Sequence, residues 1–489
     1  MTSRQRWTLA CVCTATFMLL LDITIVNVAL PDIAKDLHSS FSNLQWVVDA
    51  YSLSLAALML TAGSVADILG ARKVFVAGVA VFTAASVMCG LAKSPLFLDV
   101  ARALQGVGGA AMFSTSLSLL AANFQGKQRG TAFGLWGATI GGAVAVGPLV
   151  GGLLTEKVSW QSIFFINLPI GLLAILATMR KVDETPTRGG RIDVPGVVTF
   201  SGGLFFVIFA LVRGNAEGWG SSLIVSFLIA GVVLLLAFVA IESRSKDPML
   251  ELALFRKPAF AGASIVAFVL SSTMFSMFLY LTLYIQNSLG FRPLQAGLRF
   301  LPITVLGFFV APISGRLSQR MPVRYLMGVG LTLVGAGLLL MGGLDASSKW
   351  THLLVGFVIA GAGIGMINPA LATTAVSVVP PHQAGAGSGI NNTFRQVGIA
   401  TGIAGLGAIF QSSLQSKFPG GPPGAALASG NPAVLGPGNH HAFLVGYTDA
   451  LNELFTLTGV VALIGAVLAL ALIRQSDFVA HPAPEPAPA

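Results

Sequence analysis

Charged residues are scarce in this chain. Asp, Glu, Lys and Arg make up only 10% of its 489 residues, whereas hydrophobic residues make up 54%. Because roughly a quarter of the residues in soluble proteins are charged, this composition excludes an ordinary soluble protein. Basic residues outnumber acidic ones by 28 to 19. They are spread over short joints between apolar segments and form no soluble basic domain, so we expect no nucleic-acid partner.

Cysteine and the groups of catalytic chemistry are scarce too. The three cysteines, Cys11, Cys13 and Cys89, lie in apolar stretches, which indicates neither a disulfide framework nor a metal pair. The adjacent His440 and His441 lack the further ligands that a metal site needs. No nucleophile next to a base can be recognised. We therefore predict no enzyme, no catalytic residue, no metal and no cofactor.

Long apolar runs, in contrast, recur along the whole chain. A run of about 20 apolar residues can cross a bilayer as a helix. Fourteen runs qualify, and they cover residues 7–29, 45–66, 74–92, 96–121, 131–154, 161–180, 195–212, 222–241, 259–285, 295–316, 325–344, 352–377, 388–411 and 450–473. Arg4 and Arg6 precede the first run as in a signal peptide, but that run is too long and lacks a small-residue cleavage pattern. We predict an all-α integral membrane protein whose first span is retained.

The joints between the runs predict the orientation. An even number of spans places both termini on one side of the membrane. The joints and termini on that side carry 18 Lys and Arg residues, against 7 on the other side. Since cytoplasmic loops are enriched in Lys and Arg, we predict that both termini are cytoplasmic. We expect a multi-pass protein of a bacterial-type inner (cytoplasmic) membrane.

The spans contain an internal repeat. Three groups of residues recur in the same order in the second part of the chain. They are Gly106 and Gly108 with Gly361 and Gly363, residues 128–134 with 383–389, and the joint 63–72 with 315–324. An offset of eight spans predicts two six-helix bundles separated by two extra helices. Transporters with parallel repeats bind substrate between the two halves, near the middle of the membrane.

The repeat divides the chain into four expected regions. They are a six-helix bundle (1–180), two additional helices with their cytoplasmic joints (181–258), a second six-helix bundle (259–474) and a disordered cytoplasmic tail (475–489). The second bundle includes a Gly- and Pro-rich extracytoplasmic loop, 412–449. The tail alternates Pro with small residues, a composition that forms no packed core.

Asp22 is an acidic residue inside the first apolar run. A charged group there costs several kcal/mol unless it is paired or faces a polar cavity, so it marks a candidate functional site. At 1.5 Å per residue it lies about 11 Å below the outer end of its helix, and Arg102 in the fourth span lies at nearly the same depth. Asp49 in the second span lies slightly nearer the outer surface.

We predict that these three residues couple transport to protons. Burial disfavours an ionised carboxylate and a neighbouring guanidinium favours it, so such a carboxylate can be poised to titrate. Simpler interpretations stay open. Arg102 could pair locally with Asp99, three residues before it. Asp49 could be wetted from outside, and Asp22 could be purely structural.

Two glycine-containing stretches predict moving parts. The first is a cytoplasmic joint with Gly63, Asp67, Gly70, Arg72 and Lys73. Asp67 can cap a neighbouring helix N-terminus or pair with Arg72, which would lock one conformation; an ordinary charged turn is the alternative. The second is the glycine-dense fifth span with Gly141, Gly147, Pro148, Gly151 and Gly152. Small residues let helices approach closely and proline permits a kink, although simple close packing would use the same residues.

Together these residues resemble the fourteen-helix drug/proton antiporter family of the major facilitator superfamily. The resemblance rests on the stretches Leu21 to Pro31, Gly63 to Lys73, Arg102 to Gly108, Gly147 to Gly152 and Trp160 to Pro169. It implies the major facilitator fold and proton coupling by Asp22 and Arg102. It also implies gating by Asp67 and Arg72, and an antiport conformational change at Gly147 and Pro148. One departure is Ile68, where the family's loop motif usually has a basic residue.

The sequence therefore predicts a proton-coupled exporter of amphipathic or aromatic small molecules such as antibiotics, working by alternating access. The proton gradient drives it, so its partners are substrate, protons and the lipid bilayer, and we expect a monomer. The candidate substrate-cavity residues are Asn27, Gln105, Tyr280, Asn391, Asn392 and Arg395. The Met- and Phe-rich stretch 274–280 offers that cavity a soft wall, or packs against lipid.

Acidic residues are absent from the tenth to thirteenth spans, where some multidrug members of the family carry them. This absence disfavours dicationic drugs as substrates. A lipid or lysolipid flippase and a proton-coupled solute importer are the alternative functions on the same fold.

Overall fold

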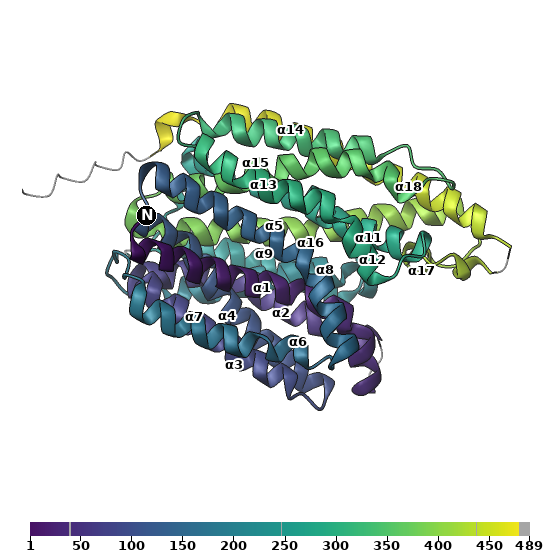
Figure 1. Ribbon diagram of the computed structural model, residues 1–489, viewed down its shortest axis with the longest axis horizontal. Coiled ribbons are helices and arrows are strands. Elements are labelled where there is room, and N and C mark those ends of the chain that lie inside the picture. Colours follow the sequence, from purple (N-terminus) through teal and green to yellow (C-terminus); the bar gives the residue numbers. More distant parts are fainter. Residues whose placement is uncertain (39–40, 246, 437, 479–489) are drawn as a thin grey trace, which may run out of the picture.

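The computed structural model describes residues 1–38, 41–245, 247–436 and 438–478. Long helices run side by side through the molecule, and the chain turns back at its two ends (Figure 1). The described residues form α-helices with a few 3-10 and π turns, and no strand occurs among them. The predicted all-α class is confirmed.

The first six predicted spans correspond to seven helices. They are α1 (Ser3–Asp36), α2 (Phe41–Leu69), α3 (Ala71–Gly90), α4 (Pro95–Asn123), α5 (Gly126–Lys157), α6 (Ser162–Phe165) and α7 (Asn167–Lys181). We call α1 to α7 the first half. Local sequence explains individual helix starts: the Ser94 Oγ accepts a hydrogen bond from the Phe97 N–H, and Pro95 occupies the first turn, where a missing N–H costs little.

The rest of the chain follows the same plan. The two additional helices, here called the insert, are α8 (Val194–Glu217) and α9 (Ser222–Glu242). The second half comprises α10 (Pro258–Leu270), α11 (Ser276–Leu283), α12 (Pro293–Arg299), α13 (Leu301–Leu317), α14 (Val323–Met341), α15 (Leu354–Ser377), α16 (Ala384–Lys417), α17 (Gly424–Ala428) and α18 (His440–Leu472). A π turn, Ser271–Phe275, joins α10 to α11 within the ninth span.

Twelve helices among the described residues are long and apolar enough to cross a membrane. The two remaining predicted spans are α13, whose apolar helix has only 17 residues, and α5. These two helices lie against each other, from Gly130 beside Gly315 to Gly141 beside Thr304. All fourteen predicted spans are therefore helical in the structure.

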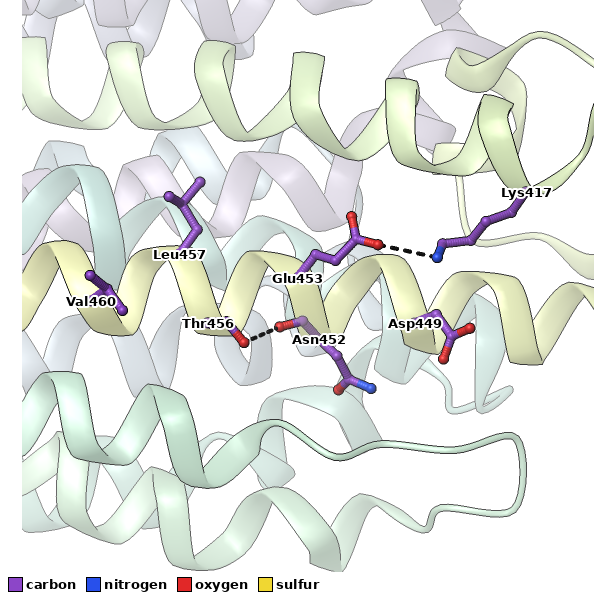
Figure 2. A pocket seen from close by; sticks show the side chains of 7 residues that line it. All are labelled: Lys417, Asp449, Asn452, Glu453, Thr456, Leu457 and Val460. Atoms are coloured by element: carbon purple, nitrogen blue, oxygen red, sulfur yellow. Dashed lines mark hydrogen bonds and ion pairs between the residues drawn. The ribbon is translucent and has the colours of Figure 1, made fainter.

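The expected loop 412–449 is shorter than predicted. The helix α16 continues to Lys417 and α18 already begins at His440, because the Gly- and Pro-rich composition concealed the helix ends. Lys417 Nζ lies 3.1 Å from Glu453 Oε1 on α18, and Figure 2 shows this ion pair at an open cavity of about 670 Å³. His440 starts α18 together with its neighbour, and no cluster of three or more metal-ligating residues occurs in the described ranges.

Both described ends of the chain lie at the same end of the bundle. Arg4 is paired with Asp183 in the joint before the insert, at 2.7 Å. At the other terminus, the Asp477 carboxylate accepts a hydrogen bond from the Ala259 N–H at the start of α10. Asp477 belongs to a 3-10 turn, Gln475–Asp477, so the expected disordered tail starts with structure; residues 479–489 lie outside the described ranges.

We call this end of the bundle the basic end. Its joints carry most of the exposed cations, among them Arg4, Lys73, Arg180, Lys181, Arg244, Arg256, Arg316 and Arg320. This distribution agrees with the charge count that predicted the orientation.

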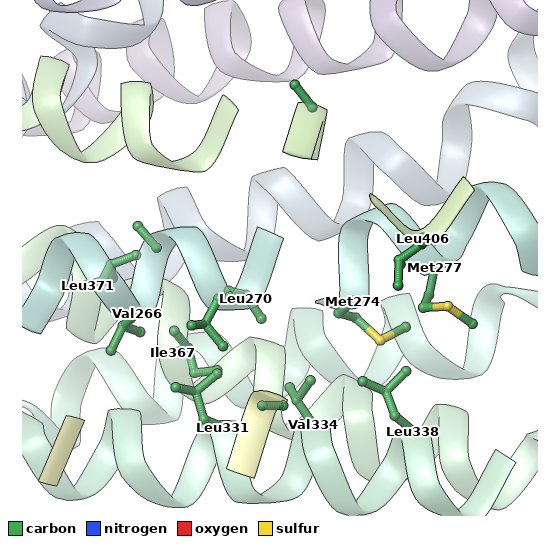
Figure 3. Close-up of a cluster of buried hydrophobic side chains, with 14 of the residues drawn as sticks. Val266, Leu270, Met274, Met277, Leu331, Val334, Leu338, Ile367, Leu371 and Leu406 are labelled. Carbon is green, nitrogen blue, oxygen red and sulfur yellow. The ribbon is translucent and has the colours of Figure 1, made fainter. Parts of the chain in front are cut away.

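Apolar packing forms a large cluster that lies mostly in the second half and extends into the insert and α2, and two smaller clusters that lie mostly in the first half. The ninth span contributes Val266, Leu270, Met274 and Met277 to the large cluster, where they lie with residues of α14 and α15 (Figure 3). The two methionines of the predicted soft wall are therefore fully buried core residues, neither lipid-facing nor cavity-lining.

The repeat is reproduced in the helix contacts. In the first half, Gly106 of α4 lies against α2, and Gly108 lies against Gly78 of α3. In the second half, the matching Gly361 of α15 lies against α13, and Gly363 lies against Gly330 of α14. Small residues at these positions allow the helix backbones to approach closely.

Four other glycines of the repeat join the two halves at the basic end. Gly63 of α2 is pressed against the backbone of Gly385 on α16. Its repeat counterpart Gly315 of α13 is pressed against Gly130 of α5, which is the counterpart of Gly385. A Cβ on any of the four would overlap a carbonyl of its partner, so both contacts require glycine.

Replacing Gly63 by Ala should open the basic end. We expect a Cys introduced at the buried Ser388, in a background without native cysteines, to react at least tenfold faster with a membrane-impermeant maleimide. The matched control is Gly152→Ala, because nothing lies within 4 Å of the added Cβ. Equal labelling rates in Gly63→Ala and in the parent would show that the contact does not close this end.

Candidate functional site

Asp22 and Arg102 form a buried ion pair in the first half. The Arg102 Nη1 lies 2.5 Å from the Asp22 Oδ2, and the two residues are 1% and 2% exposed respectively. The guanidinium lies over the ring of Tyr51, 4.2 Å from its centroid, which adds a cation–π contact. Arg102 also donates from Nε to the carbonyl of Val47 at 2.9 Å. The pair thus connects α1, α2 and α4.

Neutral side chains complete the shell around the Asp22 carboxylate. The Gln105 Nε2 donates to Asp22 Oδ1 at 2.8 Å, and its Oε1 accepts from Arg102 at 2.7 Å. The Asn167 Nδ2 on α7 reaches the same Oδ1 at 3.4 Å and donates to the Ser86 hydroxyl on α3 at 2.9 Å. Such a closed polar network is worth more in a low-dielectric interior than its separate bonds.

The sequence predictions for this network are partly met. The sequence places Asp22 and Arg102 at nearly the same depth in the membrane, and in the structure they are paired. The alternative, a local pair of Arg102 with Asp99, does not form. Gln105, predicted for the substrate cavity, belongs to the carboxylate shell instead. Asn167 and Ser86 were missed: Asn167 was detectable as an amide inside an apolar run, whereas a lone serine gives no signal.

Asp49 lies apart from this group. Its carboxylate is 3.8 Å from Arg213 on α8 of the insert, and Arg213 also pairs with Glu217 at 3.0 Å. The guanidinium of Arg213 lies 5.2 Å from the ring of Trp46. The expectation that Asp49 joins Asp22 and Arg102 is therefore corrected, because an insert cation at the same level binds it.

Asp67 joins the two halves at the basic end. Its carboxylate accepts hydrogen bonds from the backbone N–H groups of Gly385 at 2.7 Å and Ala386 at 2.8 Å. These N–H groups belong to the first turn of α16, where the helix dipole favours a negative charge. Of the two alternatives predicted for Asp67, the structure shows the helix cap and not the pair with Arg72.

Arg72 is held by the joint before the insert. Its backbone N–H donates to Glu184 at 2.8 Å, and its guanidinium donates to the carbonyl of Val182 at 3.2 Å. Gly70 has a φ of 100°, a left-handed conformation that favours glycine, and an added Cβ would overlap Glu184. Lys73 is exposed. The joint thereby fixes the turn between α2 and α3.

The glycines of α5 have unequal surroundings. Gly147 lies against the Thr24 side chain and Gly151 against Ile25, so both bring α5 close to α1, two and three residues beyond Asp22. Gly141 faces Thr304 of α13 in the second half, whereas Gly152 faces open space. The side chains of Pro148 and of Asn27 lie outside the described part of the structure.

A small cavity lies between the halves. It is lined by Gly137, Ile140 and Gly141 of α5 and by Phe275, Phe278, Ile303, Thr304, Gly307, Ile364, Gly365 and Asn368 of the second half. Its volume of about 30 Å³ has room for water but not for a drug-sized compound. The ninth span thus supplies Phe275 and Phe278 to the cavity.

The residues that line this cavity do not include the predicted cavity residues of the second half. Arg395 on α16 donates to the Asn368 Oδ1 at 2.7 Å and so touches a cavity-lining side chain. Asn391 and Asn392 are buried on the same helix. The Tyr280 hydroxyl donates to the carbonyl of Ile403 at 2.9 Å, which places it in the α11–α16 contact and not on the cavity wall.

Comparisons with known proteins agree with this architecture. A family model described as Major Facilitator Superfamily matches residues 12–403. The tetracenomycin C resistance and export protein of Streptomyces glaucescens is 33% identical, covering 99% of this chain and 94% of that protein. The puromycin resistance protein pur8 of Streptomyces alboniger is 37% identical, covering 94% and 91%.

A solved structure shows the same fold. The major facilitator superfamily proton:xylose symporter XylE superimposes with a TM-score of 0.66 over 96% of each chain, at 11% sequence identity. Together with the family match over most of the chain, this likeness settles the class of the protein. The chain belongs to the Major Facilitator Superfamily and is a multi-pass secondary transporter without a cofactor, not an enzyme.

Proposed function

We propose that the chain is a proton-driven exporter of antibiotic-like small molecules, with the basic end in the cytoplasm. The buried Asp22–Arg102 pair is the observation that carries the proton-coupling part of this proposal. The two similar proteins are named for resistance, and one of them for export, which favours export over solute import or lipid flipping. Each chain holds both halves of the transport unit, so we propose that it acts as a monomer.

The carboxylate of Asp22 is the proton-binding group. It lies inside a span, and its only charged partner among the described residues is Arg102. When Asp22 binds a proton, it loses its charge and its attraction to the guanidinium. Arg102 keeps its bonds to Val47 and Gln105 and its contact with Tyr51, so the group that becomes free to move is α1.

Movement of α1 is transmitted to the interface between the halves through α5. Thr24 and Ile25 lie in the next turn after Asp22 and are packed against Gly147 and Gly151. The same helix α5 faces the second half at Gly141 and Gly130. A shift of α1 relative to α4 therefore changes the position of α5 on α13.

The proposed cycle has two end states. In the first, the basic end is closed as in the structure, and Asp22 takes up a proton that comes from outside. The protonated carboxyl leaves Arg102, and the halves rock so that the Asp67 cap and the glycine contacts at the cytoplasmic end separate. Substrate then enters from the cytoplasm, the proton leaves to the cytoplasm, and re-formation of the ion pair closes this end again.

Asp22→Asn should abolish proton coupling. We expect substrate-induced proton release from detergent-purified protein to fall at least tenfold, because the amide cannot bind and release a proton at neutral pH. The double variant Asp22→Asn/Arg102→Gln controls for the unpaired guanidinium, which is costly to bury alone. Asp449→Asn, an exposed acid on α18, is the charge-matched control. Undiminished proton release in both Asp22 variants would disprove the role of this residue.

Asp67→Asn should weaken closure of the basic end. The amide loses the negative charge that the α16 N-terminus favours, and its NH₂ group cannot accept from a backbone N–H. We expect spin labels at Lys73→Cys and Arg320→Cys, one on each half, to report a longer mean distance than in the parent. The control is Lys73→Gln, with the spin labels placed at other positions of the basic end. Its mean distance between labels should equal that of the parent. A distance distribution that is unchanged in Asp67→Asn would contradict the gating role.

The orientation can be tested by labelling. In a background without native cysteines, single cysteines are introduced at Lys73, which is exposed at the basic end, and at Lys349, which is exposed at the opposite end. We expect an impermeant maleimide to label the Lys349→Cys variant in intact cells and the Lys73→Cys variant only in everted vesicles. The reverse pattern would place the basic end outside.

A further inference from the structure

Arg395 is a buried cation without a buried anion. It is 7% exposed and lies inside the apolar helix α16. The Nη2 donates to the neutral Asn368, whereas the Nε is buried and has no hydrogen-bond partner in the described part of the chain. None of the ion pairs among the described residues involves Arg395. A guanidinium in this environment is unfavourable unless something supplies negative charge.

The acids of the second half are all at the ends of the bundle. They are Asp345, Asp449, Glu453 and Asp477, in the opposite-end loop, on the outer part of α18 and in the terminal turn. In the first half, Asp22 and Asp67 are bonded to Arg102 and to the α16 N-terminus. No carboxylate of the described chain is therefore assigned to Arg395 in this conformation.

Further polar groups without partners lie on α16 in the two turns before Arg395. They are the Ser388 Oγ, Asn391 Nδ2, Asn392 Nδ2, Asn392 Oδ1 and Thr393 Oγ1, all buried and without a hydrogen-bond partner in the described residues. Ser388, Asn391 and Arg395 are spaced by three and four residues, so they lie on one face of the helix. Buried polar groups are normally bonded, and a cluster of groups unbonded within the protein marks a candidate site for a ligand or water.

The neighbouring cavity supplies an aromatic surface. Asn368 bonds to Arg395 and also lines the cavity between the halves. The same cavity is lined by the rings of Phe275 and Phe278, and its other lining residues are uncharged. Its present volume of about 30 Å³ excludes a drug-sized compound, so such a compound can enter only when the halves separate.

We propose that this site binds aromatic compounds that carry an anionic group, such as a carboxylate or an ionised phenol, and that Arg395 binds that group. This inference rests on the proposed export function and names its substrate class. The guanidinium offers several N–H donors in a plane that suits a carboxylate, and the two phenylalanines suit an aromatic ring. A cationic compound would meet an unpaired positive charge and no acid, which agrees with the absence of acids from these spans.

Three probes with one ring system and different charges test this assignment. They are 1-pyrenecarboxylate, 1-pyrenemethanol and 1-pyrenemethylammonium, whose binding to the purified protein can be followed by fluorescence anisotropy. We expect the carboxylate to bind at least tenfold more tightly than the alcohol and the ammonium. In Arg395→Gln, affinity for the carboxylate should fall at least tenfold, and affinity for the alcohol should stay within twofold. The control Arg316→Gln removes an exposed cation at the basic end and should keep the preference.

A second variant keeps the proposal testable if Arg395→Gln fails to fold. Asn368→Asp would place a carboxylate beside Arg395, where the amide oxygen now accepts at 2.7 Å. It gives the guanidinium an internal counter-charge, so the protein should remain folded, with an unchanged or higher melting temperature, and should lose the preference for the anion. Equal affinity of the parent for the three probes, or failure to bind any of them, would overturn the proposal. Undiminished anion binding in both variants would overturn it as well.

Transport separates this inference from the export function. A proton gradient, acidic inside, is set up across everted vesicles that contain the protein, and the uptake of each probe is measured. Tight, Arg395-dependent binding of pyrenecarboxylate without proton-coupled uptake would contradict the exporter and support the anion site. Proton-coupled uptake of the ammonium probe that is equal in the parent and in Arg395→Gln would support the exporter and contradict the anion site.

Discussion

A charge inside a membrane-spanning bundle needs a counter-charge or a set of hydrogen bonds, and this requirement organises the protein. The most fully satisfied charge is Asp22, which is bonded to Arg102, Gln105 and Asn167. Those partners come from two other helices, α4 and α7, so the position of α1 in the first half depends on the charge of a single carboxylate. In the proposed cycle, proton binding at that carboxylate is thereby linked to helix packing.

Two other acids inside the spans, Asp67 and Asp49, have partners that connect different parts of the molecule. Asp67 connects the halves, because its partners are backbone groups of α16. Asp49 connects the first half to the insert through Arg213. The joint before the insert extends this connection, since Arg188 donates from its backbone to the Asp67 carbonyl and from its side chain to the Pro248 carbonyl. The insert is therefore attached to the closing contact.

The fold and part of the site could be predicted from the sequence. Apolar run length predicted every span, because a bilayer imposes one length on all of them. Depth along two antiparallel helices was enough to pair Asp22 with Arg102. It failed for Asp49, since depth does not specify which side of a helix faces which neighbour, and Arg213 belongs to an insert with no counterpart in the repeat. Likewise the sequence places Gln105 on α4 but does not specify which side of that helix faces the cavity and which faces Asp22. Met274 and Met277 show the same limit, as composition suggested a cavity wall and packing placed them in the core.

The reciprocal glycine contacts have a mechanical consequence. Gly63 with Gly385 and Gly130 with Gly315 are two equivalent contacts across the interface between the halves, and each uses one residue from each repeat. A rotation of one half against the other, about an axis between these two contacts, strains both contacts equally. Separating one while the other holds would require the halves to shear, which densely packed helices resist. The two contacts should therefore separate together. No partly open state through which protons could leak should then persist between the two end states.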